Sequence, residues 1–97
     1  MRRTNNNQSV ETLFETILKQ NGIWQKFLEQ KIVNNWKTIV GTKIAKSTTK
    51  IEIVGGKLYL SVDSSVLRNE LLMLKSNIID LVNSKAGENI INDVVIR

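Results

Sequence analysis

Residues 49–62 read TKIEIVGGKLYLSV and have the most regular pattern in the chain. Apolar and polar side chains alternate before and after the pair Gly55-Gly56, and this alternation is typical of strands with one buried face. Two glycines at the centre tolerate the positive backbone angles of a tight two-residue turn. We therefore predict a β-hairpin whose inward-facing residues are Ile51, Ile53, Leu58, Leu60 and Val62.

The opposite face of this hairpin carries polar and aromatic side chains. Successive side chains of a strand point to opposite faces, so this face is expected to present Lys50, Glu52, Lys57, Tyr59 and Ser61. When helices cover only one side of a sheet, the other face or an edge stays available to a partner.

The segment before the hairpin has the spacing of amphipathic helices. A first helix is expected over residues 9–20, because Ser9 can cap its start and Asn21-Gly22 can end it. A second apolar stripe predicts another helix over residues 24–40, which Gly41 interrupts.

The segment after the hairpin predicts one long helix and a returning strand. Side chains of Asp63-Ser64-Ser65 can cap a helix that continues to Ala86-Gly87, and residues 90–97 are typical of a strand. The order is therefore helix, helix, strand, strand, helix, strand. It predicts an α+β fold with two layers, in which a three-stranded mixed sheet packs on helices.

Length and composition limit the chain to one small domain. A chain of 97 residues buries only about 60–65% of the surface that its unfolded form exposes, which leaves no room for a second core. We expect a single domain over residues 9–97, preceded by a flexible polar tail over residues 1–8 that carries Arg2 and Arg3. No secretory signal or membrane-spanning run is recognisable, which favours a soluble cytoplasmic protein.

The residue types that are missing limit the chemistry. The chain has no His and no Cys, which supply most zinc ligands, most general bases near neutral pH and the most reactive nucleophile of proteins. Its nine acidic residues are scattered singly. We therefore expect a non-enzyme with no catalytic residues, no metal, no cofactor and no small-molecule substrate.

Positive charge is concentrated in the middle of the chain. Between Lys19 and Lys57 there are eight lysines, opposed only by Glu29 and Glu52. If these lysines converge on one surface, they would attract a phosphate backbone through counterion release. The alternative is that they are the solvated faces of separate elements. The candidate nucleic-acid contacts are Lys43, Lys46, Lys50 and Lys57, with Arg68 and Lys75 as second choices.

Both tryptophans and one glycine have structural interpretations. Trp36 lies on the apolar face of the second predicted helix, and Trp24 lies at its beginning, so core positions are favoured over binding positions for both. Gly41 is predicted to be needed for the backbone and not for a ligand: it either ends a helix or allows another segment to pack closely against the chain.

Several short motifs resemble those of the DciA family. They are WKTIVG at residues 36–41, Ile44-Ala45, GKLYLSV at residues 56–62, and Ser64-Ser65 followed by Glu70-Leu71. Their order and spacing match the family from about Val10 to Arg97. The structural positions of this motif set are Trp36, Gly41, Gly56 and Leu71.

The resemblance implies a KH-like domain of a bacterial DNA-replication protein. Such proteins bind the hexameric replicative helicase and help to place it on DNA, with some affinity for nucleic acid. The chain lacks the GxxG loop with which KH domains clamp a nucleic-acid backbone, so any contact is expected to run through lysines. The expected partners are therefore the replicative helicase and a nucleic acid, which is DNA or alternatively RNA, and not a membrane. Two alternatives stay open: a general nucleic-acid-binding domain without a helicase role, and a protein-interaction module.

Overall fold

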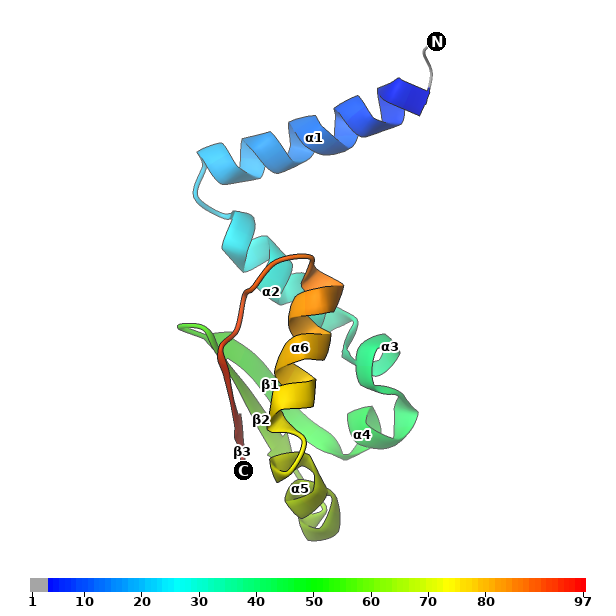
Figure 1. Cartoon of the computed structure of the whole chain (residues 1–97), viewed down its shortest axis with the longest axis vertical. Coiled ribbons are helices and arrows are strands. Elements are labelled where there is room, and N and C mark those ends of the chain that lie inside the picture. The colour runs from blue at the N-terminus through cyan, green and yellow to red at the C-terminus, as the bar shows by residue number, and fades with distance from the viewer. Residues whose placement is uncertain (1–3) are drawn as a thin grey trace.

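The computed structural model describes residues 4–97, with side chains from residue 10 onward. Figure 1 shows a three-stranded sheet with helices on one side and a first helix that projects from the body. The elements are α1 (Thr4–Gln20), α2 (Trp24–Asn34), α3 (Trp36–Val40), α4 (Thr42–Ser47), β1 (Thr48–Val54), β2 (Lys57–Val62), α5 (Ser65–Leu72), α6 (Lys75–Ala86) and β3 (Asp93–Ile96). The predicted α+β class and the predicted order of helices and strands are confirmed.

The sheet has the order β1-β2-β3. β1 and β2 are antiparallel and form the predicted hairpin, with Ile53 opposite Leu58, whereas β2 and β3 are parallel. Gly55 and Gly56 have φ angles of 58° and 78°, as a two-residue turn with positive φ at both central positions requires. The sheet is therefore mixed, as expected for a strand that returns after a helical crossover.

One hydrophobic core joins the sheet to the helices. Trp36 is buried, and its indole Nε1 donates a hydrogen bond of 3.1 Å to Thr48 Oγ1, which itself donates to the Ile44 carbonyl at 2.7 Å. This chain of bonds ties α3 and α4 to the start of β1. The predicted core position of Trp36 is confirmed, and the buried hydrophobic residues are Leu28, Ile32, Trp36, Ile53, Leu58, Leu60, Val62, Leu67, Leu71, Ile78, Val82, Ala86, Ile90, Ile91 and Val94.

Two predicted helices are each divided in the structure. The second predicted helix breaks at Asn35, whose side-chain Nδ2 donates to the Lys31 carbonyl at 2.8 Å and so competes with the helical backbone. The long helix predicted after the hairpin breaks at Met73-Leu74, although neither residue disfavours a helix locally. The break lets α5 pack on β2 and β3 while α6 turns to pack on α2 and β3. Prediction of a single long helix was therefore wrong.

The ends of the helices follow the predicted caps, except at the start of α1. Ser64 caps α5, because its Oγ accepts a hydrogen bond of 3.2 Å from the Leu67 amide, and Gly87 ends α6 in the left-handed conformation. α1 begins at Thr4, ahead of the expected start at Ser9, because extending a formed helix costs little per residue. Arg2 and Arg3 lie outside the described residues.

Candidate functional site

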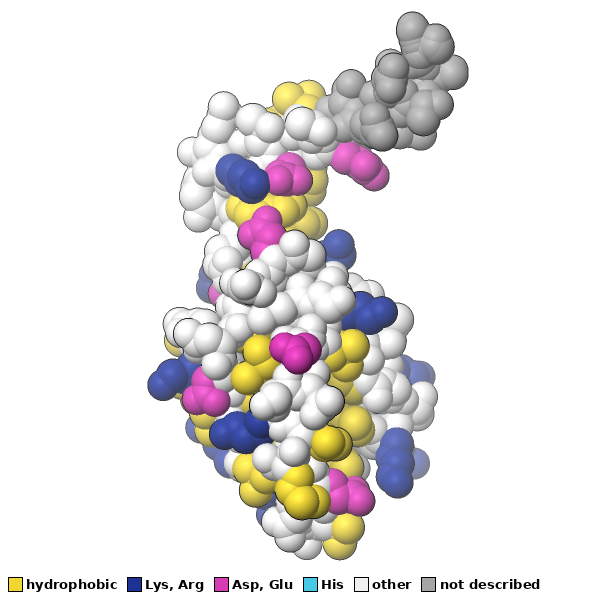
Figure 2. All heavy atoms as spheres, in the orientation of Figure 1, with side chains coloured by type: hydrophobic (Ala, Val, Ile, Leu, Met, Phe, Trp, Pro, Cys, Tyr) yellow, Lys and Arg dark blue, Asp and Glu magenta, His cyan; other side chains and the backbone are white. Residues whose placement is uncertain are grey.

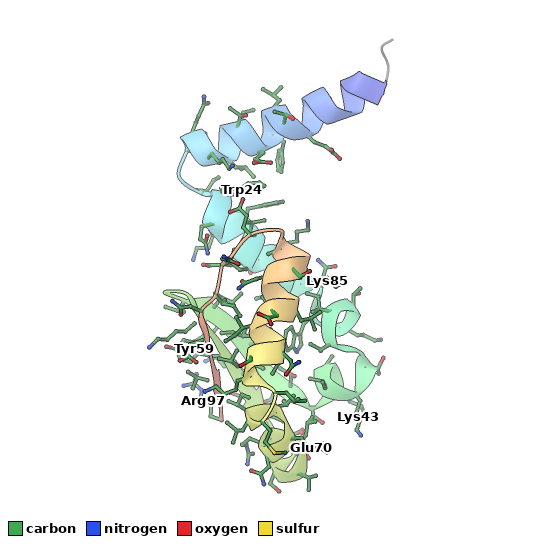
Figure 3. The ribbon with its side chains drawn as sticks, in the orientation of Figure 1. Trp24, Lys43, Tyr59, Glu70, Lys85 and Arg97 are labelled. Carbon is green, nitrogen blue, oxygen red and sulfur yellow. The ribbon has the colours of Figure 1, made fainter. Side chains whose placement is uncertain are left out.

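The predicted nucleic-acid contacts lie at three places, not on one surface. Lys43 and Lys46 belong to α4, Lys50 and Lys57 to the hairpin, and Arg68 and Lys75 to α5 and α6. Figure 2 shows dark blue side chains on both flanks of the body. In Figure 3, Lys43 lies on the opposite side of the body from Tyr59 and Arg97.

The basic group on α4 is held in place by the turn at Gly41. The φ of Gly41 is 92° and its ψ is 166°, and this turn folds α4 back beside α3. Lys46 and Lys37 consequently line one hollow of about 270 Å³, and both side chains are exposed. Lys37, which was not among the predicted contacts, therefore lies with Lys46, and Gly41 ends α3, as the predicted helix stop requires.

The second basic group lies on the open sheet face, which we define as the face that the helices leave uncovered. Strand register places Lys50 opposite Ser61 and Glu52 opposite Tyr59 on this face, while Ile51 and Ile53 face the core. The alternation in the sequence predicted this arrangement. By register the face is composed of Lys50, Glu52, Val54, Lys57, Tyr59, Ser61, Asp93, Val95 and Arg97.

Arg97 joins the open sheet face through the register of β3. Its amide donates to the Leu60 carbonyl at 2.9 Å, and its carbonyl accepts from the Val62 amide at 2.8 Å. The guanidinium lies over the ring of Tyr59, 5.1 Å from the ring centroid. Local sequence patterns do not point to Arg97, because its place beside Tyr59 depends on the parallel pairing of β2 and β3.

The second-choice contacts already have partners within the chain. The guanidinium of Arg68 donates to the Val62 carbonyl at 2.8 Å, which ties α5 to the end of β2. Lys75 Nζ lies 3.7 Å from Asp93 Oδ1 at the edge of the sheet. A phosphate at either place would compete with these contacts, as it would at Lys50, whose Nζ lies 3.8 Å from Glu52 Oε2.

α1 forms an arm with an exposed apolar stripe. Val10, Leu13, Phe14 and Ile17 remain 66%, 60%, 49% and 45% exposed, and the arm contacts the body through α2. Figure 1 shows α1 projecting from the rest of the molecule. Contiguous exposed apolar side chains on a folded protein mark an interaction site, so this stripe is a second candidate surface.

Aromatic side chains fix the junction between the arm and the body. Phe14 contacts Phe27 edge to face, with 5.4 Å between the ring centroids, and Phe27 stacks on Trp24, with 5.6 Å between the ring centroids. The indole Nε1 of Trp24 donates to Glu88 Oε2 at 2.7 Å, so the half-buried Trp24 links α2 to the loop after α6. Lys19 Nζ lies 5.5 Å from the Trp24 ring, and its hydrogen bond to Glu15 raises the pKa of Lys19 above its usual value.

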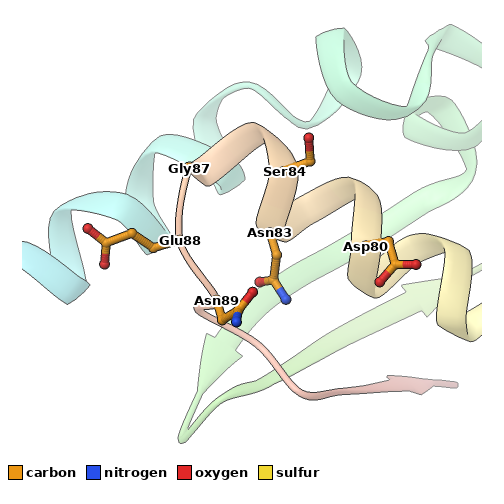
Figure 4. A pocket seen from close by; sticks show the side chains of 6 residues that line it. All are labelled: Asp80, Asn83, Ser84, Gly87, Glu88 and Asn89. Atoms are coloured by element: carbon orange, nitrogen blue, oxygen red, sulfur yellow. The ribbon is translucent and has the colours of Figure 1, made fainter.

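A polar hollow of about 420 Å³ lies at the end of α6 (Figure 4). Asn83 organises this region, because its Oδ1 accepts from the amides of Ile90 and Ile91 and its Nδ2 donates to the Ile91 carbonyl. Asp80 and Glu88 also line the hollow, and their negative charges disfavour a phosphate there. In the described part of the chain, no group of three or more acidic side chains could hold a metal ion.

Comparison with protein families gives a match over residues 9–96 to the family described as "Dna[CI] antecedent, DciA". The chain belongs to the DciA family. None of the helices between residues 4 and 97 has the length and apolar character needed to cross a bilayer.

A curated relative of this DciA-family chain is a UPF0232 protein of Corynebacterium glutamicum (strain R). The two are 33% identical over 63 residues, which cover 65% of this chain and 35% of the relative. The match therefore spans about a third of the length of the relative. No solved structure matches the chain significantly.

Proposed function

We propose that this DciA-family chain is a non-enzymatic adaptor that binds the bacterial replicative helicase and DNA and so assists helicase loading. The family match over residues 9–96 is the observation that carries the proposal. Two features of the structure support it, because an adaptor needs one surface for protein and another for nucleic acid. The apolar arm and the exposed lysines are separate surfaces of these two kinds.

The exposed stripe of α1 is the proposed contact with the helicase. Three of its exposed apolar side chains, Val10, Leu13 and Ile17, follow helical spacing and so form one continuous face. An amphipathic helix of this kind binds by laying its apolar face into a hydrophobic groove of a partner. The neighbouring Thr12 and Thr16 are exposed polar residues of the same helix, which provides a matched control surface.

The exposed lysines are the proposed contacts with DNA phosphates. Lys43 and Lys46 would contribute from α4, and Lys50 and Lys57 from the open sheet face. None of these four side chains is buried, and Lys50 is paired with Glu52, whose carboxylate lies 3.8 Å from the ammonium group. Such contacts position a protein on nucleic acid and carry no sequence preference.

The experiment measures binding of the fluorescently labelled chain to its cognate replicative helicase by anisotropy. We expect the unmodified chain to bind and the double substitution Leu13→Gln with Ile17→Gln to weaken binding at least about tenfold, since each truncated anchor of an interface commonly costs about 1 kcal/mol or more. The control, Thr12→Gln with Thr16→Gln, should bind normally. All variants should unfold at the same urea concentration, because the substituted side chains are exposed.

Three outcomes separate the possible functions. Failure of the folded chain to bind helicase would contradict the adaptor proposal. DNA affinity that is unchanged by added helicase would favour the alternative of a general nucleic-acid-binding domain. Equal binding of helicase by both double variants would place the helicase contact outside the arm.

A further inference from the structure

We propose that the open sheet face binds single-stranded nucleic acid, with an unpaired base stacked at the Tyr59–Arg97 pair and the backbone held by Lys50 and Lys57. The inference rests on the proposed nucleic-acid binding and names its site, the form of the ligand and the mode of recognition. Its starting point is the position of an aromatic ring in the middle of an uncovered sheet.

Tyr59 is a rigid platform, because it belongs to the central strand. The register places it between Glu52 of β1 and Val95 of β3, on the face opposite the buried Leu58 and Leu60. Its backbone is therefore fixed by ladders on both sides. A ring held in this way loses little conformational freedom when a ligand stacks on it.

The guanidinium of Arg97 completes the platform with a second flat group. Its centre lies 5.1 Å from the ring centroid of Tyr59, which is within the range of a cation–π contact. The two backbone hydrogen bonds of Arg97 to β2 fix the base of this side chain, although the residue follows the last residue of β3. Nucleic-acid bases stack on aromatic rings and on guanidinium planes, so the pair offers two stacking surfaces.

The platform distinguishes single strands from duplexes. The bases of a duplex are already stacked on one another and present only their edges in the grooves. An unpaired base can leave the stack and cover the Tyr59 ring or the Arg97 guanidinium. Every base has a π face, so this contact tolerates any sequence and is worth about 1–3 kcal/mol per base.

The charges on the same face suit a phosphate backbone that crosses the platform. Lys50 lies opposite Ser61 and Lys57 lies at the other end of β2, about 13 Å away at the usual rise of a strand. Tyr59 therefore lies between the two ammonium groups. Of the acidic residues nearby, Glu52 is 3.8 Å from Lys50 and Asp93 is 3.7 Å from Lys75, so both already have cationic neighbours. The exposed Lys50–Glu52 pair contributes little to stability and is easily exchanged for a phosphate.

The test compares two labelled single strands by fluorescence anisotropy with the full chain. One is an oligothymidylate of about 12 nucleotides, and the other is an abasic strand of the same length, which keeps the phosphates and lacks the bases. We expect Tyr59→Ala to weaken binding of oligothymidylate about tenfold and to leave binding of the abasic strand unchanged. Tyr59→Phe keeps the ring and should bind as the unmodified chain does.

Matched variants exclude trivial explanations. Tyr59→Thr also removes the ring but keeps a residue suited to a central strand. If Tyr59→Ala is poorly folded, Tyr59→Thr takes its place, and we expect it to lose the same affinity for oligothymidylate. Lys85→Ala on α6 is the charge control, because Lys85 lies away from the sheet face, and it should bind oligothymidylate nearly as well as the unmodified chain (Figure 3). Oligouridylate in a parallel titration distinguishes RNA from DNA as the preferred strand.

The outcomes separate this inference from the proposed function. If the unmodified chain binds oligothymidylate and both ring-removing variants bind equally well, stacking at Tyr59 is refuted while the adaptor proposal stands. Stacking would also be refuted if the ring-removing variants lost equal affinity for both strands, because the abasic strand has no bases that could stack on the ring. If the unmodified chain binds neither strand at low salt, this inference and the nucleic-acid half of the adaptor proposal both fail, whereas the helicase titration remains a separate test.

Discussion

Gly41 shows how much one residue contributes to the placement of the basic side chains. Its φ of 92° and ψ of 166° fall in a region that only glycine adopts readily, and this turn brings α4 back beside α3. Lys37 and Lys46 line the same hollow only because of that turn. A Cβ at this position would meet no atom within 4 Å, so a substitution would act through backbone strain alone.

We expect Gly41→Ala to lower the free energy of unfolding by about 1–3 kcal/mol. Urea unfolding followed by circular dichroism measures the change. The control is Gly87→Asn. Gly87 is in the left-handed helical region at φ 82°, which asparagine tolerates. A Cβ at Gly87, like one at Gly41, would meet no atom within 4 Å. Equal stability of Gly41→Ala and the unmodified chain would show that the α3–α4 turn relaxes to another conformation.

At the scale of elements, the loop between α6 and β3 is organised by one side chain. Asn83 accepts hydrogen bonds of 2.9 Å and 3.0 Å from the amides of Ile90 and Ile91, both buried, and donates to the Ile91 carbonyl at 2.9 Å. The adjacent Asn92 amide bonds to the Gly56 carbonyl, which brings β3 to β2. Asn83 therefore positions the strand that leads to Arg97.

Asn83→Ala should destabilise the fold by about 2–4 kcal/mol, because two buried amides lose their acceptor at once. Asn83→Asp is the matched control, since it keeps the oxygen that accepts from the two amides, although its second oxygen then faces the Ile91 carbonyl in place of the donor. We expect the aspartate variant to be the more stable of the two in thermal unfolding. If the alanine variant were the more stable, the two amides would have found acceptors elsewhere and Asn83 would not be the organiser of the loop.

The whole molecule is elongated and spreads its charges over two flanks. The radius of gyration is 15.8 Å, against about 12.5 Å for a compact chain of this length, because α1 projects from the body. The lysines of α4 and those of the open sheet face lie on different sides of the body, so a strand that lies along the sheet face does not also lie along α4. The protein therefore offers two separate basic surfaces.

This separation predicts unequal effects of charge reversal on a short single strand. Lys50→Glu with Lys57→Glu should weaken binding of oligothymidylate strongly. It should also reduce the magnitude of the slope of log K against log [salt] by about 1.4, because each of the two lost phosphate contacts contributes about 0.7 on a single strand. Lys43→Glu with Lys46→Glu has the same change of charge and should have a much smaller effect. Anisotropy titrations over a series of salt concentrations measure both slopes. Equal effects of the two pairs would show that net charge, and not position, governs binding.

Much of the architecture was predictable from local patterns. The hairpin at Gly55-Gly56, the cap at Ser64 and the end of α6 at Gly87 each depend on residues close together in the chain. Alternation also predicted which hairpin residues face the core, because the period of a strand assigns every side chain to a face. The α+β class follows from the order of these local elements.

The candidate site depended on contacts between distant segments. Periodicity shows which face of an element is apolar but not which element lies against it, so the exposed stripe of α1 looked like an ordinary buried helical face. The break at Met73-Leu74 accompanies the packing of α5 on β2 and β3 and of α6 on α2 and β3, and neither residue signals it locally. Likewise, Arg97 reaches Tyr59 only through the parallel pairing of β3 with β2. Local sequence encodes the elements and their faces, whereas packing determines which faces meet and which side chains remain for a partner.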